Sequence, residues 1–240
     1  MFNKIVLSPE TSYYWVNRLL APIVGAGIAL LAVGLCWGLY LAPPDYQQGE
    51  AYRIIYMHVP AAWMSLFVYM VMAGAGVTAL VWRIKFAEIV CIESAPIGAS
   101  FTALALVTGM LWGKPMWGAY WVWDARLTSE LILLFLYFGV IALHSAIADT
   151  RKASRAAGLL AVIGMVNIPI IHYSVVWWST LHQGPTVTRF GAPAAHSSIL
   201  LPLLFMAGVF MLLFVGMLLA RVRNALIMRN RGSGWVAGIV

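Results

Sequence analysis

Long apolar runs separated by short polar segments dominate the pattern along the chain. A membrane-spanning helix requires about 20 consecutive apolar residues, and six stretches of suitable length contain no Asp, Glu, Lys or Arg. A charge in the middle of such a helix costs about 2.5–3.5 kcal/mol on insertion scales, so the pattern predicts six transmembrane helices. The six runs are Leu19–Leu41, Pro60–Trp82, Ser94–Trp112, Leu131–Ala148, Ala156–Trp178 and Ile199–Ala220.

The composition supports the same fold class. Hydrophobic residues make up 62% of the 240 residues and charged residues only 10%, whereas a soluble domain carries about 25% charged residues. A water-soluble domain of this length could not cover so much apolar surface. We therefore predict an all-α integral membrane protein, in which residues 1–240 form a single six-helix membrane domain.

The net charge of +7 indicates membrane orientation rather than a nucleic-acid partner, because Lys and Arg accumulate in cytoplasmic segments. When both termini and the even-numbered connections are assigned to one side, that side holds 11 of the 15 basic residues. We therefore predict cytoplasmic termini and outward loops at about residues 42–59, 113–130 and 179–198. The 11 residues are Lys4, Arg18, Arg83, Lys85, Arg151, Lys152, Arg155, Arg221, Arg223, Arg229 and Arg231.

The outward segments are rich in tryptophan. Eight of the 11 tryptophans lie at or near the outer side, whereas a belt that only anchors the protein would mark both interfaces. Indole rings offer flat faces for stacking and an N–H group for orientation. If the segment around them is helical, Trp117, Trp121 and Asp124 share one face. We expect this segment to lie flat in the interface, with its rings turned toward a planar apolar molecule.

Two of the five histidines lie at the outer mouths of predicted spans, His58 at the second and His182 at the fifth. Neutral imidazole is a favoured axial ligand of haem iron, and two histidines beside a tryptophan-rich segment fit a six-coordinate haem. The alternative is a pair of unrelated interfacial histidines, and His196 is a third outer candidate. His144 and His172 lie within apolar runs, where we expect core histidines that a neighbouring helix satisfies.

Basic residues on the outer side fit an anionic ligand. Haem carries two carboxylates, and arginine binds carboxylates bidentately and better than lysine does. Arg126 and Arg189 are the first candidates, and Lys114 and Arg53 come second. The alternative for each of them is a solvated loop charge.

Three segments resemble one known family. Residues 112–128 read WGKPMWGAYWVWDARLT, which resembles the tryptophan-rich WWD signature of haem-handling membrane proteins. The flanks read MHVPAAWM over residues 57–64 and WWSTLHQG over residues 177–184. They resemble the haem protein C (CcmC) family of bacterial system I cytochrome c maturation. The resemblance covers nearly the whole chain, and the flanks and short length favour this family over the larger haem lyases.

The resemblance implies that haem is held at the outer face of the membrane. The haem would be a non-covalent, b-type iron protoporphyrin IX with His58 and His182 as axial ligands, and the external WWD loop, residues 112–128, would bind its edge. The candidate haem-binding residues are therefore His58, His182, Trp112, Trp117, Trp121, Trp123, Asp124, Arg126 and Arg189.

The resemblance also implies partners in the bacterial inner membrane, with the functional loops facing the periplasm. The protein would present haem to a CcmE-like periplasmic haem chaperone and assist its covalent attachment there, without a conventional active site of its own. An ATP-binding subunit, a second membrane subunit and a small single-span protein would complete an ABC-type complex. The chain contains no P-loop Gly-Lys-Ser/Thr, so ATP would be hydrolysed by the partner.

Two alternatives belong to other functional classes. A haem-exporting ABC permease subunit would need polar groups along the bundle interior, for which His172 and Asn167 are candidates. A transmembrane b-type cytochrome would need a pair of histidines deep in the bundle, for which only His144 and His172 qualify.

Overall fold

The computed structural model describes residues 8–178, 180–182 and 196–239, and the regular elements in these ranges are helices. Six helical segments are long and apolar enough to cross a membrane, which confirms the predicted all-α integral membrane fold. A π-helix, η1 (Trp37–Leu41), ends the first of these segments, and a 3-10 helix, η2 (Glu50–Ile54), begins the second. The α-helices are α2 (Pro9–Cys36), α3 (Ile55–Trp82), α4 (Lys85–Trp117), α5 (Ala125–Ala146), α6 (Thr150–Gly164), α7 (Asn167–Trp177), α8 (Ser197–Arg229) and α9 (Gly234–Ala237).

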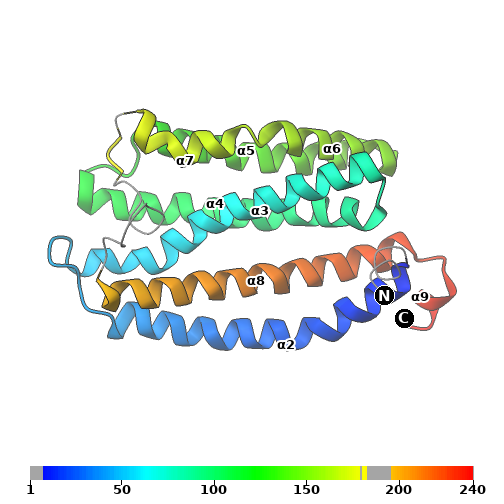
Figure 1. Ribbon diagram of the computed structural model, residues 1–240, viewed down its shortest axis with the longest axis horizontal. Helices are drawn as coiled ribbons and strands as arrows, with labels where there is room; N and C mark the ends of the chain where they lie inside the picture. Colours follow the sequence, from blue (N-terminus) through cyan, green and yellow to red (C-terminus); the bar gives the residue numbers. More distant parts are fainter. Residues whose placement is uncertain (1–7, 179, 183–195, 240) are drawn as a thin grey trace.

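The long helices lie in three layers (Figure 1). Helices α3 and α4 form the middle layer, with α5, α6 and α7 on one side and the pair α2 and α8 on the other. Helix α2 packs chiefly against α8, so most of its surface faces outward from the bundle. The middle layer therefore contains the two most buried of the six candidate spans, those of α3 and α4.

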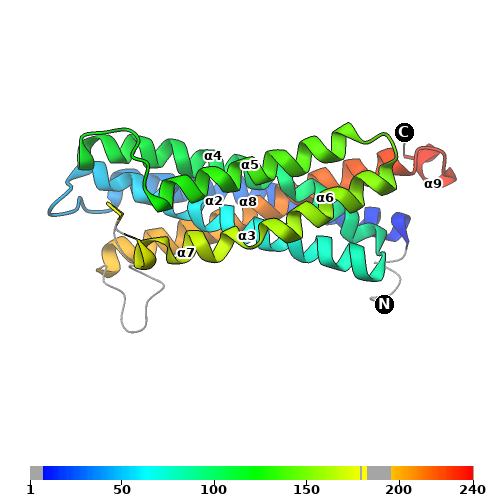
Figure 2. The same ribbon diagram turned by 90° about the horizontal axis from the view of Figure 1, so that it is seen from above.

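The two ends of the bundle are built from different connections (Figures 1 and 2). The connections 42–49 and 118–124 lie at one end, together with the end of α7; we call this the tryptophan end. The turns at Arg83–Ile84 and at 147–149 lie at the other end with the start of α2 and with α9; we call this the arginine end. The start of α2 and helix α9 thus share the arginine end. The assignment of this end to the cytoplasm stays a prediction.

A closely packed layer separates the two ends. Tyr69, Leu133 and Tyr137 are completely buried there, and the Tyr137 hydroxyl donates a hydrogen bond to the backbone carbonyl of Ser65 at 2.7 Å. A Cβ atom at Gly98 would lie only 2.1 Å from the Tyr137 ring. The absence of a side chain at Gly98 therefore lets α4 and α5 approach each other closely at this level.

The predicted external loop, residues 112–128, is helical at both ends. Helix α4 continues to Trp117 and ends where Gly118 adopts φ = 78°, a left-handed conformation that glycine adopts without a steric penalty. Helix α5 begins after Asp124, whose carboxylate accepts the Leu127 N–H at 2.8 Å as an N-cap. The expectation that Trp117, Trp121 and Asp124 share one helical face is wrong, because the helix ends between the first two.

The fifth predicted span consists of two helices, α6 and α7. Pro169 has no N–H group to donate to the carbonyl of Met165, and its ring crowds that turn, so the helix is interrupted between Gly164 and Asn167. The Asn167 amide donates to the Ser129 carbonyl at 3.0 Å. This hydrogen bond ties the start of α7 to α5.

Candidate functional site

A cavity of about 420 Å³ opens at the tryptophan end between α3, α4, α5 and α7. Its wall is mostly aromatic and aliphatic with a few polar groups, as is usual for small-molecule sites. We call it the two-histidine cavity. Five of the predicted site residues line it, namely His58, His182, Trp112, Trp117 and Arg126.

His58 lies in the first turn of α3 and is held by two residues of α4. Its Nδ1 atom lies 3.0 Å from the Thr108 hydroxyl, which itself donates to the Leu104 carbonyl at 2.6 Å. The hydroxyl oxygen therefore accepts the Nδ1–H of His58, which leaves the lone pair on Nε2. Trp112, one turn after Thr108, packs edge-on against the imidazole with ring centroids 5.6 Å apart and donates its indole N–H to Gln48 at 2.9 Å.

His182 is held in the same manner by residues of other segments. Its Nδ1 atom lies 3.1 Å from the Asp124 carboxylate, and its backbone N–H donates to the Thr180 hydroxyl at 3.1 Å. The Thr180 hydroxyl donates to the same carboxylate oxygen of Asp124. Trp117 packs against the imidazole with ring centroids 4.8 Å apart. A carboxylate that accepts the Nδ1–H fixes the tautomer whose Nε2 lone pair can bind a metal. Such a carboxylate is a usual partner of a metal-bound histidine.

The electrostatics around His182 favour its neutral form. Burial opposes ionisation of Asp124, yet hydrogen bonds from Thr180, the Leu127 N–H and His182 hold the pKa of this carboxyl below its ordinary value. Burial lowers the pKa of His182, and the hydrogen bond with Asp124 offsets this only in part. At neutral pH the pair is therefore a carboxylate beside a neutral imidazole, the form that binds a metal.

Arg126 and Glu130 contribute a cation and a carboxyl group to the cavity wall. Arg126 donates to the Ile171 carbonyl of α7 at 3.0 Å, and Glu130 follows Arg126 by one turn of α5. Glu130 is buried and accepts a hydrogen bond from the Ser65 hydroxyl at 2.6 Å. Glu130 was not among the predicted site residues, because the predicted span began at the next residue, Leu131. The available signal was the spacing of Arg126 and Glu130, which places opposite charges on one helical face.

The four tryptophans of residues 112–128 divide into two pairs. Trp112 and Trp117 line the two-histidine cavity, whereas Trp121 and Trp123 contact each other in the connection 118–124, with ring centroids 5.3 Å apart. Trp123 is exposed, and the indole N–H of Trp121 is buried without a hydrogen-bond partner in the described part of the chain. The structure therefore brings together two of the four predicted tryptophans around the cavity.

The secondary basic candidates stabilise connections of the chain. Arg53 forms an ion pair with Glu50 and donates to the Ala42 carbonyl, and Lys114 donates to the Gly118 carbonyl at 3.0 Å, beyond the end of α4. These contacts differ from the predicted role in binding a carboxylate ligand. Arg189 lies outside the described residues.

The other histidines have separate environments. His196 is exposed and caps α8 by accepting the Ser198 N–H. His172 is exposed and lines the two-histidine cavity, so the expectation of a core histidine is wrong there. His144 has a buried Nε2 atom without a hydrogen-bond partner in the described ranges, which differs from the predicted satisfied histidine. His144 lies near the arginine end of α5 and His172 near the tryptophan end, so they form no pair of ligands.

Fold and cavity together define a polytopic membrane protein with two supported histidines and two tryptophans around one site. The family model described as heme exporter protein C matches residues 2–237, and the chain belongs to this CcmC family. It is 48% identical over 231 residues to heme exporter protein C of Haemophilus influenzae, covering 96% of this chain and 94% of the relative.

Two further relatives extend the comparison. The chain is 53% identical over 215 residues to heme exporter protein C of Escherichia coli strain K12, covering 90% of this chain and 86% of the relative. It is also 45% identical over 201 residues to a putative cytochrome c biosynthesis ccmC-like mitochondrial protein of Marchantia polymorpha. That match covers 77% of this chain and 85% of the relative.

Proposed function

We propose that this protein binds haem in the two-histidine cavity, at the outer face of the bacterial inner membrane, and presents it to a periplasmic haem chaperone for c-type cytochrome biogenesis. One observation carries the proposal. His58 and His182 line the same cavity, and each has Nδ1 engaged in a hydrogen bond, so that the lone pair on Nε2 is the one left for a metal. Two imidazoles of this form suit the axial positions of a haem iron.

The residues present fit haem as the cargo of this site. Trp112 and Trp117 supply aromatic surface for an apolar ring. Arg126 uses one guanidinium nitrogen for the Ile171 carbonyl. Its other N–H groups have no hydrogen bond to the described residues and suit a haem carboxylate. Haem itself supplies the iron that takes the two imidazoles, and this chain supplies the ligands, the apolar wall and the cation.

The orientation follows from the distribution of charge. Lys and Arg accumulate at the arginine end, so the positive-inside rule assigns that end to the cytoplasm and the two-histidine cavity to the periplasm. A periplasmic cavity is accessible to a periplasmic chaperone. We further propose an ABC-type complex with an ATP-binding subunit, a second membrane subunit and a small single-span protein; the relatives' name, heme exporter protein C, supports a membrane assembly that handles haem.

Haem binding is tested by absorption spectra of the detergent-purified protein. We expect a Soret band with low-spin, six-coordinate features in the wild type, and an altered spectrum in His58→Ala and in His182→Ala. His196→Ala is the matched control, because His196 lies at the same end of the bundle but does not line the cavity. A wild-type spectrum in the double variant His58→Ala/His182→Ala would overturn the assignment of the ligands.

Delivery is tested separately by co-expression with the chaperone and its ATP-binding and membrane partners. We expect covalent haem on the chaperone, measured by haem staining after denaturing electrophoresis, with wild-type protein and with His196→Ala. We expect none with the double variant. Unchanged loading by a double variant that has lost its haem spectrum would contradict delivery from this cavity.

A further inference from the structure

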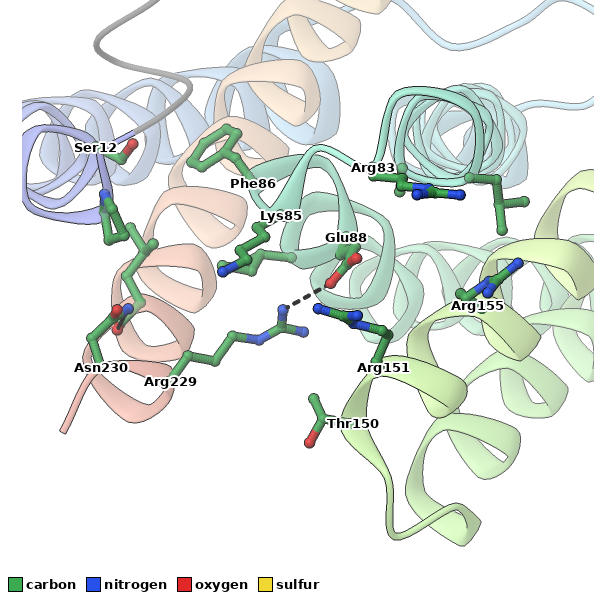
Figure 3. Close-up of a pocket in the computed structure, with 15 residues that line it drawn as sticks. Ser12, Arg83, Lys85, Phe86, Glu88, Thr150, Arg151, Arg155, Arg229 and Asn230 are labelled. Carbon is green, nitrogen blue, oxygen red and sulfur yellow. Dashed lines mark hydrogen bonds and ion pairs between the residues drawn. The ribbon is translucent and has the colours of Figure 1, made fainter. Parts of the chain in front are cut away.

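A second cavity, of about 820 Å³, opens at the arginine end, where the ends of five helices meet. Its lining joins the start of α2, the end of α3, the start of α4, the start of α6 and the end of α8. Five cations and one carboxylate line this basic cavity (Figure 3). They are Arg83, Lys85, Arg151, Arg155, Arg229 and Glu88.

The cations of the basic cavity exceed the carboxylates by four. The Glu88 carboxylate binds Arg229 at 3.4 Å, and Figure 3 shows the Arg151 side chain also pointing toward Glu88. Within the described ranges, Arg83, Lys85, Arg151 and Arg155 form no ion pair with a carboxylate. Cations that share a cavity without partners raise its positive potential and favour an anionic ligand.

The backbone at Arg83 adds an independent observation. Arg83 follows the last residue of α3 with φ = 55°, and it is the one non-glycine residue with positive φ in the described part of the chain. Glycine is the usual residue at such a helix end, because a side chain is strained in this conformation. A strained position that carries a cation into a cavity indicates a use for the side chain.

The lining is amphipathic as well as basic. Apolar side chains from α3, α4 and α8 line the basic cavity beside the cations, among them Leu80, Phe86 and Leu226. Val81 and Trp82, next to Arg83 in sequence, are exposed at the end of α3. A free phosphate would use the cations and leave the apolar wall uncovered, whereas a phospholipid covers both. Basic pockets between transmembrane helices on the cytoplasmic side suit anionic headgroups.

We infer that the basic cavity binds the phosphate headgroup of an anionic phospholipid of the inner leaflet, with the acyl chains along the apolar part of its lining. The lipid would neutralise the surplus of cations and join α2 and α8 to the rest of the bundle at this end. This inference does not depend on haem, because no residue lines both the basic cavity and the two-histidine cavity.

The inference is tested by native mass spectrometry of the full chain, released from nanodiscs of phosphatidylcholine that contain a minor fraction of phosphatidylglycerol. Each cation near an anionic headgroup contributes about 1 kcal/mol, which corresponds to about five-fold in retention. We expect retention of phosphatidylglycerol to fall about 25-fold in Arg151→Gln/Arg155→Gln. Arg223→Gln/Arg231→Gln is the matched control, because these arginines belong to the same end but do not line the cavity. We expect less than about two-fold loss there.

Arg83→Gly separates binding from folding. Removing the side chain relieves the strain at φ = 55°, so we expect thermal stability equal to or above the wild type, together with about five-fold weaker lipid retention. Equal retention of phosphatidylcholine and phosphatidylglycerol by the wild type would overturn the inference, and so would equal losses in the control variant. Displacement of the lipid by millimolar phosphate or ATP would indicate that the cavity binds a soluble phosphate compound, and it would overturn the inference that the ligand is a phospholipid.

Discussion

The two cavities differ in how their polar groups are held. In the two-histidine cavity, His58 and His182 each have a hydrogen-bond partner on Nδ1 and a tryptophan against the ring. In the basic cavity, four of the five cations have no ion-pair partner in the described part of the chain. Metal ligation depends on fixed atoms and geometry, whereas attraction of an anion depends mainly on the sum of nearby charges. The contrast therefore fits two different kinds of ligand.

The layer between the cavities bears on the permease alternative. Tyr69, Leu133 and Tyr137 are completely buried between the two ends. Asn167, a candidate for lining a pathway, instead donates to the Ser129 carbonyl. These contacts favour two separate sites over one polar route through the bundle.

The largest expected effect is a loss of haem binding at the tryptophan end that leaves lipid binding at the arginine end unchanged. We expect His58→Ala/His182→Ala to weaken haem binding by more than about 100-fold, because loss of the ligands exceeds the 10- to 100-fold cost of losing their outer supports. The same variant is expected to retain phosphatidylglycerol like the wild type. Haem titration and native mass spectrometry on one preparation measure both quantities. A parallel loss of lipid would show that the ends are not independent.

The second effect tests the support of one histidine. Asp124→Asn keeps an N-cap for α5, since asparagine caps helices as well as aspartate does, but it removes the carboxylate from His182. We expect haem affinity to fall about 10- to 100-fold. Asp149→Asn is the matched control, because Asp149 caps α6 at the arginine end through the Lys152 N–H at 2.9 Å. Equal haem affinity in both variants would contradict a supporting role for Asp124.

The fold was largely predictable because charge and apolar length decide membrane insertion. The six runs located every span, but the helices extend beyond them. Helix α8 continues to Arg229, nine residues past the predicted end at Ala220, because long basic side chains are compatible with a helix that leaves the apolar layer. The break between α6 and α7 required recognition that Pro169 disrupts the turn before it.

The candidate histidine ligands could be predicted from the sequence, whereas most of the residues that hold them in place could not. His58 and His182 were found from their positions at the span ends and from the family resemblance. Thr108 and Gln48 contact the site only through packing of α4 against α3 and the connection before it, which no local pattern reveals. The division of the tryptophans depends on Gly118 ending α4, since a continuous helix would have placed Trp121 differently.

The third effect concerns the layer between the two ends. Gly98→Ala would place a methyl group against the Tyr137 ring, and overpacking of this kind costs about 1–3 kcal/mol. We expect a lower thermal unfolding midpoint in detergent. Gly74→Ala is the matched control, because a Cβ atom there meets nothing within 4 Å. If the layer only separates the ends, haem affinity at a temperature where Gly98→Ala is folded should change less than about two-fold. A larger change would indicate coupling through this layer.

The smallest effect is the dependence of haem binding on pH above neutrality. Because burial lowers the pKa of His182 below 6.5, its imidazole is already neutral at pH 7, and we expect less than about two-fold change in affinity between pH 7 and 8.5. As pH falls below the lowered pKa, protons compete with the iron and affinity decreases. Asp124 favours the charged imidazole, so in Asp124→Asn the decrease should begin at lower pH although binding is weaker throughout. A decrease that begins at higher pH in this variant would show that Asp124 does not act on His182 by this electrostatic route.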